Sequence, residues 1–192
     1  MLLRELKNHL IDLLYDACVQ DINYIKTELS QDIFFAYTIY CDSGFVSFGS
    51  AACTRKSIEN IFFEDKQAYL RAETFSSEWN YVKNTWQLFS SVNEKVDQIF
   101  NAFYANEIVD LPEIPGSLDF KRLYDFFISI VEDLIKKIKD SKILFNINFE
   151  NDVLLGLQFG DPDETEVNFI LDISEKVNSP AWHKKMLKAY NP

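Results

Sequence analysis

The feature that most constrains the fold is the stretch from Asp32 to Thr54, DIFFAYTIYCDSGFVSFGSAACT. It contains two runs rich in β-forming residues, joined by the turn-forming sequence Asp42-Ser43-Gly44. The first run is apolar on both of its alternating faces, which predicts an internal strand of a sheet. The second run alternates small with large residues, as expected where a helix packs closely over one face. We predict a hairpin whose turn centres on Ser43 and places Cys41 opposite Phe45.

Apolar residues recur every three or four positions in other segments, and this spacing predicts amphipathic helices. Three of them are predicted near residues 3–25, 91–106 and 117–139. Thr54 is a typical N-cap residue, so we predict a further helix from there to Ala72. The C-terminal region predicts one or two helices interrupted at Pro180, because the residue before a proline avoids helical backbone.

Strand character returns after Lys142, with Asn151-Asp152 as the predicted turn between a short run and the apolar segment from Val153 to Phe159. These strands are expected to join the hairpin. The predicted fold class is therefore α/β (α+β): a single mixed, largely antiparallel sheet with an N-terminal hairpin, packed by several α-helices. We predict one domain over residues 1–192, with a linker at 107–117, where prolines and glycine prevent a helix.

Charge and cysteine content narrow the possible partners and location. The 192-residue chain has a formal net charge of -11, which disfavours nucleic acid, since phosphate binding needs clustered Lys and Arg. A basic protein partner is easier electrostatically, although acidity also serves solubility. No apolar run approaches the roughly 20 residues that span a bilayer, so we predict no membrane segment. Three cysteines without metal-type spacing predict buried free thiols and a cytoplasmic location.

No motif in the sequence specifies a reaction. A P-loop, a dinucleotide-binding glycine motif and a nucleophile elbow are all missing from it, and its two histidines have no neighbouring signature. We therefore assign no catalytic residue, no metal ligand and no cofactor. Asp161 and Asp163 follow a predicted strand, where carboxylates can be catalytic or can bind metal. The alternative is a turn and helix start, with Asp163 or Thr165 as the N-cap.

A second group of candidate residues lies between the predicted helices. Glu78 stands among large aromatic residues, so it is either a desolvated carboxyl with a raised pKa, suited to acid or base chemistry, or a group that hydrogen-bonds nearby backbone. Trp79, Tyr81 and Trp86 form either an exposed binding platform or part of the core. With Asp161 and Asp163, these four residues are the tentative binding residues.

Several short motifs, taken in order, resemble one known family. They are FFAYTIYCDSGFVSFGSAACT, YLRAETFSSEWNY, LFSSVNEKVDQIF, VLLGLQFGDPDE and LKAYNP. Together they resemble the bacterial family called domain of unknown function 4303, over nearly the whole chain. Glu78-Trp79 and Tyr190-Asn191-Pro192 match its pattern, whereas Cys53-Thr54 stands where the family has Asn-Thr. The resemblance implies no established activity or catalytic residue, and it implies small cytoplasmic proteins found among toxin and immunity loci.

Three hypotheses for function follow. The leading one is a non-enzymatic protein-binding module, for example an immunity protein that occludes a basic toxin. The second is a small enzyme that uses Glu78 or Asp161 as acid or base, or Cys41 as nucleophile, in a cleft between the sheet and the C-terminal helices. The third is a structural subunit of a homo-oligomer, which buries its aromatic residues against a second copy.

Overall fold

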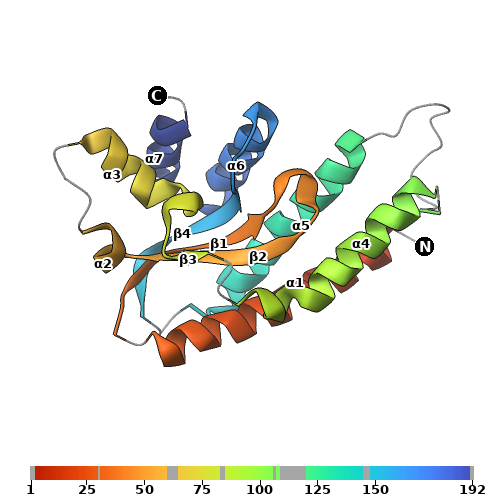
Figure 1. The fold of residues 1–192 in the computed structure, drawn as a ribbon, viewed down its shortest axis with the longest axis horizontal. Coiled ribbons are helices and arrows are strands. Elements are labelled where there is room, and N and C mark those ends of the chain that lie inside the picture. Colours follow the sequence, from red (N-terminus) through yellow and green to blue (C-terminus); the bar gives the residue numbers. More distant parts are fainter. Residues whose placement is uncertain are drawn as a thin grey trace.

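A four-stranded mixed sheet with the order β3-β2-β1-β4 forms the centre of the protein (Figure 1). The computed structural model describes residues 3–29, 31–59, 65–82, 85–105, 107–108, 120–144 and 148–190. The strands are β1 (Phe34–Cys41), β2 (Phe48–Thr54), β3 (Tyr81–Val82) and β4 (Phe149–Phe159). β1 pairs with β2 and β2 with β3 in antiparallel orientation, while β1 pairs with β4 in parallel. The predicted mixed α+β fold, with the N-terminal hairpin at its centre, is confirmed.

Every residue of β1 and β2 is buried, so the sheet is covered on both faces. β1 lies between β2 and β4, as its two apolar faces predict. The predicted register is wrong, however: Cys41 lies opposite Phe48, and not opposite Phe45. The connection is longer than a tight turn because Ser43–Phe45 forms a short 3-10 helix, η1, before β2 begins.

Contacts with a distant helix explain this longer connection. Gly44 has a φ of 73°, a backbone conformation that favours glycine. The Ser43 hydroxyl and the Gly44 N–H both donate hydrogen bonds to the buried carboxylate of Glu166, at 2.7 and 3.1 Å. The turn is therefore shaped by a residue more than 120 positions away in the sequence.

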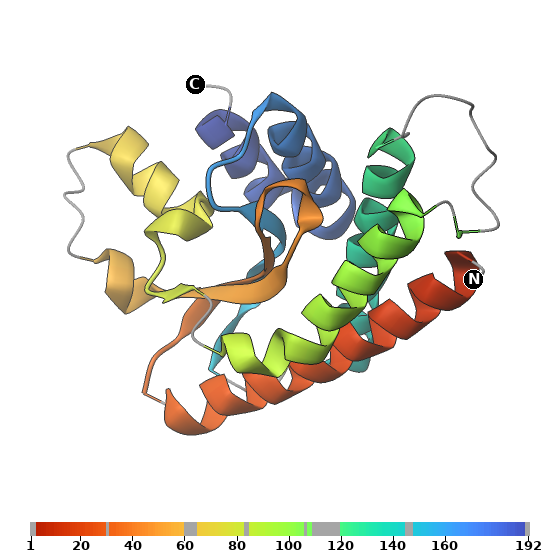
Figure 2. The ribbon, with the colours of Figure 1, turned by 45° about the vertical axis from the view of Figure 1, so that its right-hand side comes forward.

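Helices cover both faces of the sheet (Figures 1 and 2). On one side α1 (Leu3–Glu28) packs against α4 (Ser90–Tyr104) and α5 (Phe120–Ser141). On the other side lie α3 (Lys66–Thr74), α6 (Glu164–Val177) and α7 (Pro180–Tyr190). Short elements connect them: α2 (Arg55–Ile58), η2 (Ser76–Glu78) and η3 (Trp86–Phe89). The helices predicted near 3–25, 91–106 and 117–139 correspond to α1, α4 and α5, and Pro180 begins α7.

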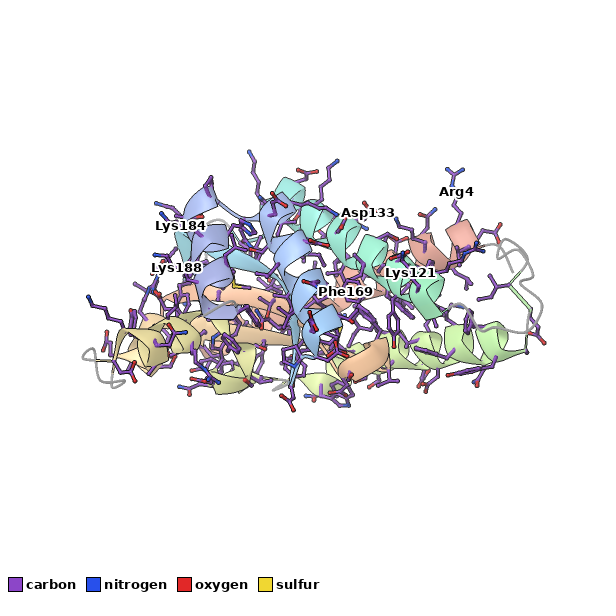
Figure 3. The ribbon with its side chains drawn as sticks, turned by 90° about the horizontal axis from the view of Figure 1, so that it is seen from above. Arg4, Lys121, Asp133, Phe169, Lys184 and Lys188 are labelled. Atoms are coloured by element: carbon purple, nitrogen blue, oxygen red, sulfur yellow. The ribbon has the colours of Figure 1, made fainter. Side chains whose placement is uncertain are left out.

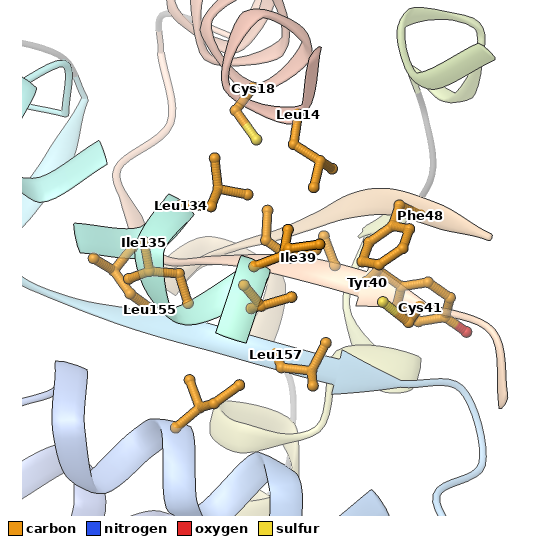
Figure 4. Packing of buried hydrophobic residues seen from close by; sticks show 14 of the residues in the cluster. Leu14, Cys18, Ile39, Tyr40, Cys41, Phe48, Leu134, Ile135, Leu155 and Leu157 are labelled. Carbon is orange, nitrogen blue, oxygen red and sulfur yellow. The ribbon is translucent and has the colours of Figure 1, made fainter. Parts of the chain in front are cut away.

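The core is built where the apolar stripes of these helices meet the sheet. Leu14 and Cys18 of α1 and Leu134 of α5 lie over Ile39 and Leu157 of the sheet (Figure 4). On α7 the side chains of Trp182 and Met186 are buried, whereas Lys184 and Lys188 lie on its outer side (Figure 3). The amphipathic pattern thus orients each helix as its sequence predicts.

Thr54 caps a helix as predicted, because its hydroxyl accepts a hydrogen bond from the Ser57 N–H. The prediction of one helix from there to Ala72 is wrong. Asp65 has extended backbone and begins a new helix, α3, by accepting hydrogen bonds from the N–H groups of Gln67 and Ala68. A second N-cap residue inside the apolar pattern therefore divides it into α2 and α3.

The predicted turn at Asn151-Asp152 is also wrong, because both residues belong to the continuous strand β4. The pairing with β1 is irregular here: Phe34 lies opposite Phe149, and Ala36 lies opposite Leu154. β4 accommodates the extra residues as a bulge, and Asn151 and Asp152 are exposed. Asn151 and Asp152 therefore lie where the register of β4 shifts, and the chain does not reverse its direction there.

The three cysteines are buried free thiols, as predicted. None of the helices in the described part of the chain is long and apolar enough to cross a membrane. Of the predicted linker at 107–117, only residues 107 and 108 belong to the described part.

Candidate functional site

An open groove of about 450 Å³ runs between the C-terminal half of α1 and η3. We call it the α1–η3 groove. Its lining residues are Gln20, Asn23, Tyr24 and Thr27 from α1, and Thr85, Gln87 and Leu88 from the η3 segment. The four residues of α1 follow an i, i+3, i+4, i+7 spacing, which places them on one face of the helix. They adjoin the apolar stripe that packs on the sheet, so the groove lies directly beside the core.

The buried carboxylate of Asp21 lies next to this groove. A small cavity of about 10 Å³ is lined by Asp21 and Ser50, and it shares Tyr24 and Thr85 with the α1–η3 groove. Asp21 is only 3% exposed, and it accepts hydrogen bonds from the Tyr37 hydroxyl at 2.8 Å and from the Thr85 hydroxyl. This carboxylate therefore ties α1 to β1 and to the η3 segment.

Burial perturbs the titration of this group and its neighbours. Burial raises the pKa of Asp21, and hydrogen bonds from Thr85, Ser50 and Tyr37 offset only part of this rise. Burial also raises the pKa of Cys18 to about 12, and together with the nearby Asp21 carboxylate it raises the pKa of Tyr37 well above its ordinary value. Tyr37 and Cys18 therefore stay protonated at neutral pH, and Asp21 is the carboxyl of this network, with a raised pKa.

The raised pKa of Asp21 predicts a pH-dependent contribution to stability. In the unfolded chain an Asp has a pKa of about 3.9, so the folded state binds this proton more tightly. The free energy of unfolding should therefore fall as the pH rises from below about 4 to above the folded-state pKa. We expect urea denaturation to show that the stability of the wild type relative to Asp21→Asn falls as the pH rises through this range.

The difference between wild type and Asp21→Asn isolates this one group, because both proteins share all other carboxylates. Tyr37 and Cys18, which face Asp21, do not titrate in this range. A difference that stays constant with pH, or that grows in favour of the wild type as pH rises, would contradict the prediction.

The structure separates the four candidate residues of the segment from Glu78 to Trp86. Trp79 is 5% exposed and belongs to the core, which is the second of the two alternatives predicted for it and excludes it as a surface contact. Trp86 is 37% exposed and is the first residue of η3, next in sequence to the groove residues Gln87 and Leu88. Tyr81 is half-buried; it lines the small cavity, and its hydroxyl donates to Asp32 at 3.1 Å. Of the predicted aromatic platform, Tyr81 therefore lines the small cavity, and Trp86 is an exposed neighbour in sequence of the groove residues.

Glu78 does not have the environment that acid or base chemistry needs. Its side chain is 38% exposed, and it forms an ion pair with Arg71 at 3.4 Å. The predicted desolvation of this carboxylate among aromatic residues is therefore wrong, because η2 turns it away from the core into which Trp79 points.

Asp161 and Asp163 are both exposed. Asp163 forms a capping box with Glu166: its side chain accepts from the Glu166 N–H at 2.8 Å, and Glu166 accepts from the Asp163 N–H at 3.1 Å. This confirms the alternative prediction that Asp163 begins a helix. Within the described residues no group of three or more potential metal ligands converges, at Asp161 or elsewhere.

Three carboxylates of the described residues are buried, those of Asp21, Glu73 and Glu166, and the first two were not predicted as site residues. Asp21 occupies a position of the apolar stripe of α1, between Cys18 and Ile25, and this placement is a signal that periodicity could have provided. Glu73 lies on the buried side of α3, close to the end of that helix. No comparable signal marks Glu73, because its cationic partners come from other parts of the chain.

Glu73 is the centre of an ionic cluster that links α3, α2 and α7. Its carboxylate is 2.6 Å from Nη1 of Arg55 and 2.8 Å from Nζ of Lys185. The Arg55 guanidinium also binds Glu150 through two hydrogen bonds and lies 4.2 Å from the centroid of the Phe35 ring. The partners satisfy one another, so the cluster holds the helices on this face of the sheet together.

A larger groove, of about 650 Å³, lies where the end of α5 and the start of β4 meet the corner between α6 and α7. Two of its three carboxylates have structural partners, Glu150 with Arg55 and Asp152 with the Ser179 hydroxyl at 2.8 Å, and the third, Asp140, is exposed. The Lys139 ammonium in its wall donates to the carbonyl of Val177 at 2.6 Å. These contacts give Glu150, Asp152 and Lys139 structural partners.

Comparison of the chain with known protein families, with curated proteins and with solved structures finds no match. The resemblance to the domain of unknown function 4303 family is therefore neither supported nor contradicted. A functional proposal must be supported by the groove and the groups around it.

Proposed function

We propose that the chain is a protein-binding module that contacts its partner through the α1–η3 groove. The composition of the groove carries this proposal. Tyr24, which is 43% exposed, and Leu88 stand beside neutral hydrogen-bonding side chains, and the exposed Trp86 is next in sequence to the lining residue Gln87. Trp and Tyr give large contact areas at a low cost in conformational entropy, and they dominate the hot spots of protein interfaces. The described lining residues carry amide and hydroxyl groups but no charged group, and such a lining suits contact with a protein surface.

The proposed partner is a basic protein. The formal net charge of -11 favours its electrostatic steering toward this chain at moderate salt. An immunity protein that occludes a basic toxin is one instance, and the resemblance to the domain of unknown function 4303 family is the reason to consider it. Buried free thiols are compatible with the reducing cytoplasm, where we propose that the protein acts.

None of the three residues considered for an enzymatic function has an environment suited to catalysis. Glu78 is exposed and paired with Arg71, Asp161 is exposed, and Cys41 is 0% exposed, so that a substrate cannot reach its thiol. Burial raises the pKa of another thiol, Cys53, to about 11, which keeps it protonated at neutral pH. None of these environments activates an acid, a base or a nucleophile.

Substitution in the groove tests the proposal. We expect Tyr24→Ala and Trp86→Ala each to weaken partner binding at least about tenfold, as loss of an interface hot spot does. The partner is sought by co-expressing the tagged chain with the products of the genes adjacent to its own. Binding of the co-purified protein is then measured by calorimetry.

The matched control is Tyr104→Ala. Tyr104 is 54% exposed and ends α4, so it offers an exposed tyrosine outside the groove. Equal weakening by Tyr104→Ala, or full binding by both groove variants, would contradict the proposal. The size of the wild-type protein in solution distinguishes a different partner from a second copy of the chain. If the wild type is a dimer and Tyr24→Ala is a monomer, the groove binds a second copy.

A further inference from the structure

The cavity beside Asp21 has the size and the lining of a site for one small cation. Its volume of about 10 Å³ is that of a single water-sized sphere. Asp21, Ser50, Thr85 and Tyr81 are the polar residues of its lining, while Ile25 and Leu29 supply apolar walls. An ammonium group is about as large as a water molecule, whereas a planar guanidinium is much larger. The cavity therefore suits a lysine head group better than that of arginine.

Asp21 differs in its partners from Glu73, whereas Glu166 resembles Asp21 in accepting hydrogen bonds from uncharged groups. Glu73 is buried to a similar degree and is neutralised by Arg55 and Lys185. Asp21 accepts hydrogen bonds from hydroxyl groups, but within the described ranges no Lys, Arg or His forms an ion pair with it. Burying an ionised carboxylate without a cation is costly, so a cation brought from outside would gain a strong interaction.

We infer that the α1–η3 groove receives a lysine side chain of the protein partner, with its ammonium group in the cavity beside Asp21. This inference rests on the proposed protein-binding function and names the chemistry that the partner must supply. The ammonium has three donors, and the hydroxyls of Ser50 and Thr85 keep free lone pairs when they donate to Asp21. The aliphatic stem of the lysine would lie along Tyr24, which lines both the cavity and the groove.

The test uses n-butylammonium chloride as a lysine side-chain mimic, so it needs no partner protein. Titrated into the isotope-labelled chain and followed by NMR, it should shift the amide signals of Ser50, Ala52 and Thr85 saturably, with a dissociation constant on the order of millimolar. n-Butanol and n-butylguanidinium, at matched ionic strength, should not do so. The shifts should disappear in Asp21→Asn and persist in Glu28→Gln, which removes an exposed carboxylate from the same helix.

Several results would overturn the lysine site. They are the lack of saturable shifts with butylammonium, equal shifts with butanol, unchanged shifts in Asp21→Asn, and equal shifts with potassium chloride alone. If Asp21→Asn does not fold, the comparison of butylammonium with butanol on the wild type decides the matter. Tyr24→Ala tests the groove as a protein contact separately, so the lysine site can fail while the proposed function stands.

Discussion

We expect Trp79→Ala to lower the free energy of unfolding by about 4 kcal/mol, the cost of removing a large aromatic side chain from a packed core. Trp79 is 5% exposed, and its ring meets that of Phe35 edge-on, with 6.5 Å between centroids. Its indole N–H donates to the carbonyl of Ala72 at 3.0 Å. The substitution would therefore leave a cavity and also an acceptor without its donor. Urea denaturation measures the change.

Trp86→Ala is the matched control, because it removes the same side chain a few residues later. Trp86 is 37% exposed, so we expect its removal to cost less than about 1 kcal/mol. Together the two variants separate stability from the proposed recognition: Trp79 supports the core, and Trp86 is the exposed tryptophan next in sequence to the groove residues. Equal destabilisation by both would contradict this assignment.

The arrangement of helices and strands could be predicted because it depends on local patterns. Apolar spacing located α1, α4 and α5, and the two-sided apolar character of β1 placed it inside the sheet. The register of the hairpin could not be predicted, because the Glu166 carboxylate that holds Ser43 and Gly44 belongs to α6. The continuation of β4 through Asn151 and Asp152 likewise depends on its pairing with β1. Local sequence carries no signal of either contact.

The candidate site could be predicted only in part. The aromatic segment was identified, but local sequence does not say that Trp79 points into the core and Trp86 out of it, because the short helices η2 and η3 set these directions. Asp21 could have been found, since a carboxylate in an apolar stripe needs an explanation. The remaining groove residues, such as Gln20 and Thr27, are unremarkable in sequence and become a surface only when η3 packs beside α1.

Glu73 and Glu78 show the same limit for carboxylates. They are close in the chain, and each forms an ion pair with an arginine, Arg55 for Glu73 and Arg71 for Glu78. The side chain of Glu73 is 5% exposed and that of Glu78 is 38% exposed. Glu78 was predicted to be the desolvated carboxylate, because its neighbours in sequence are aromatic. The buried carboxylate is in fact that of Glu73, which forms ion pairs with Arg55 and Lys185.

This contrast predicts that Glu73→Gln destabilises the protein by about 2 kcal/mol. Breaking a fully buried ion pair costs about 3–5 kcal/mol, and the cost is smaller here because the side chains of Arg55 and Lys185 are 34% and 39% exposed and can regain water. Glu78→Gln, at the exposed pair, should change the free energy of unfolding by less than about 0.5 kcal/mol. Urea denaturation at low and at high salt measures both variants. Salt should weaken the small effect at Glu78 more than that at Glu73, because exposed charges are the better screened. Equal effects of the two substitutions would show that the cluster around Glu73 does not stabilise the packing of α7 on α3.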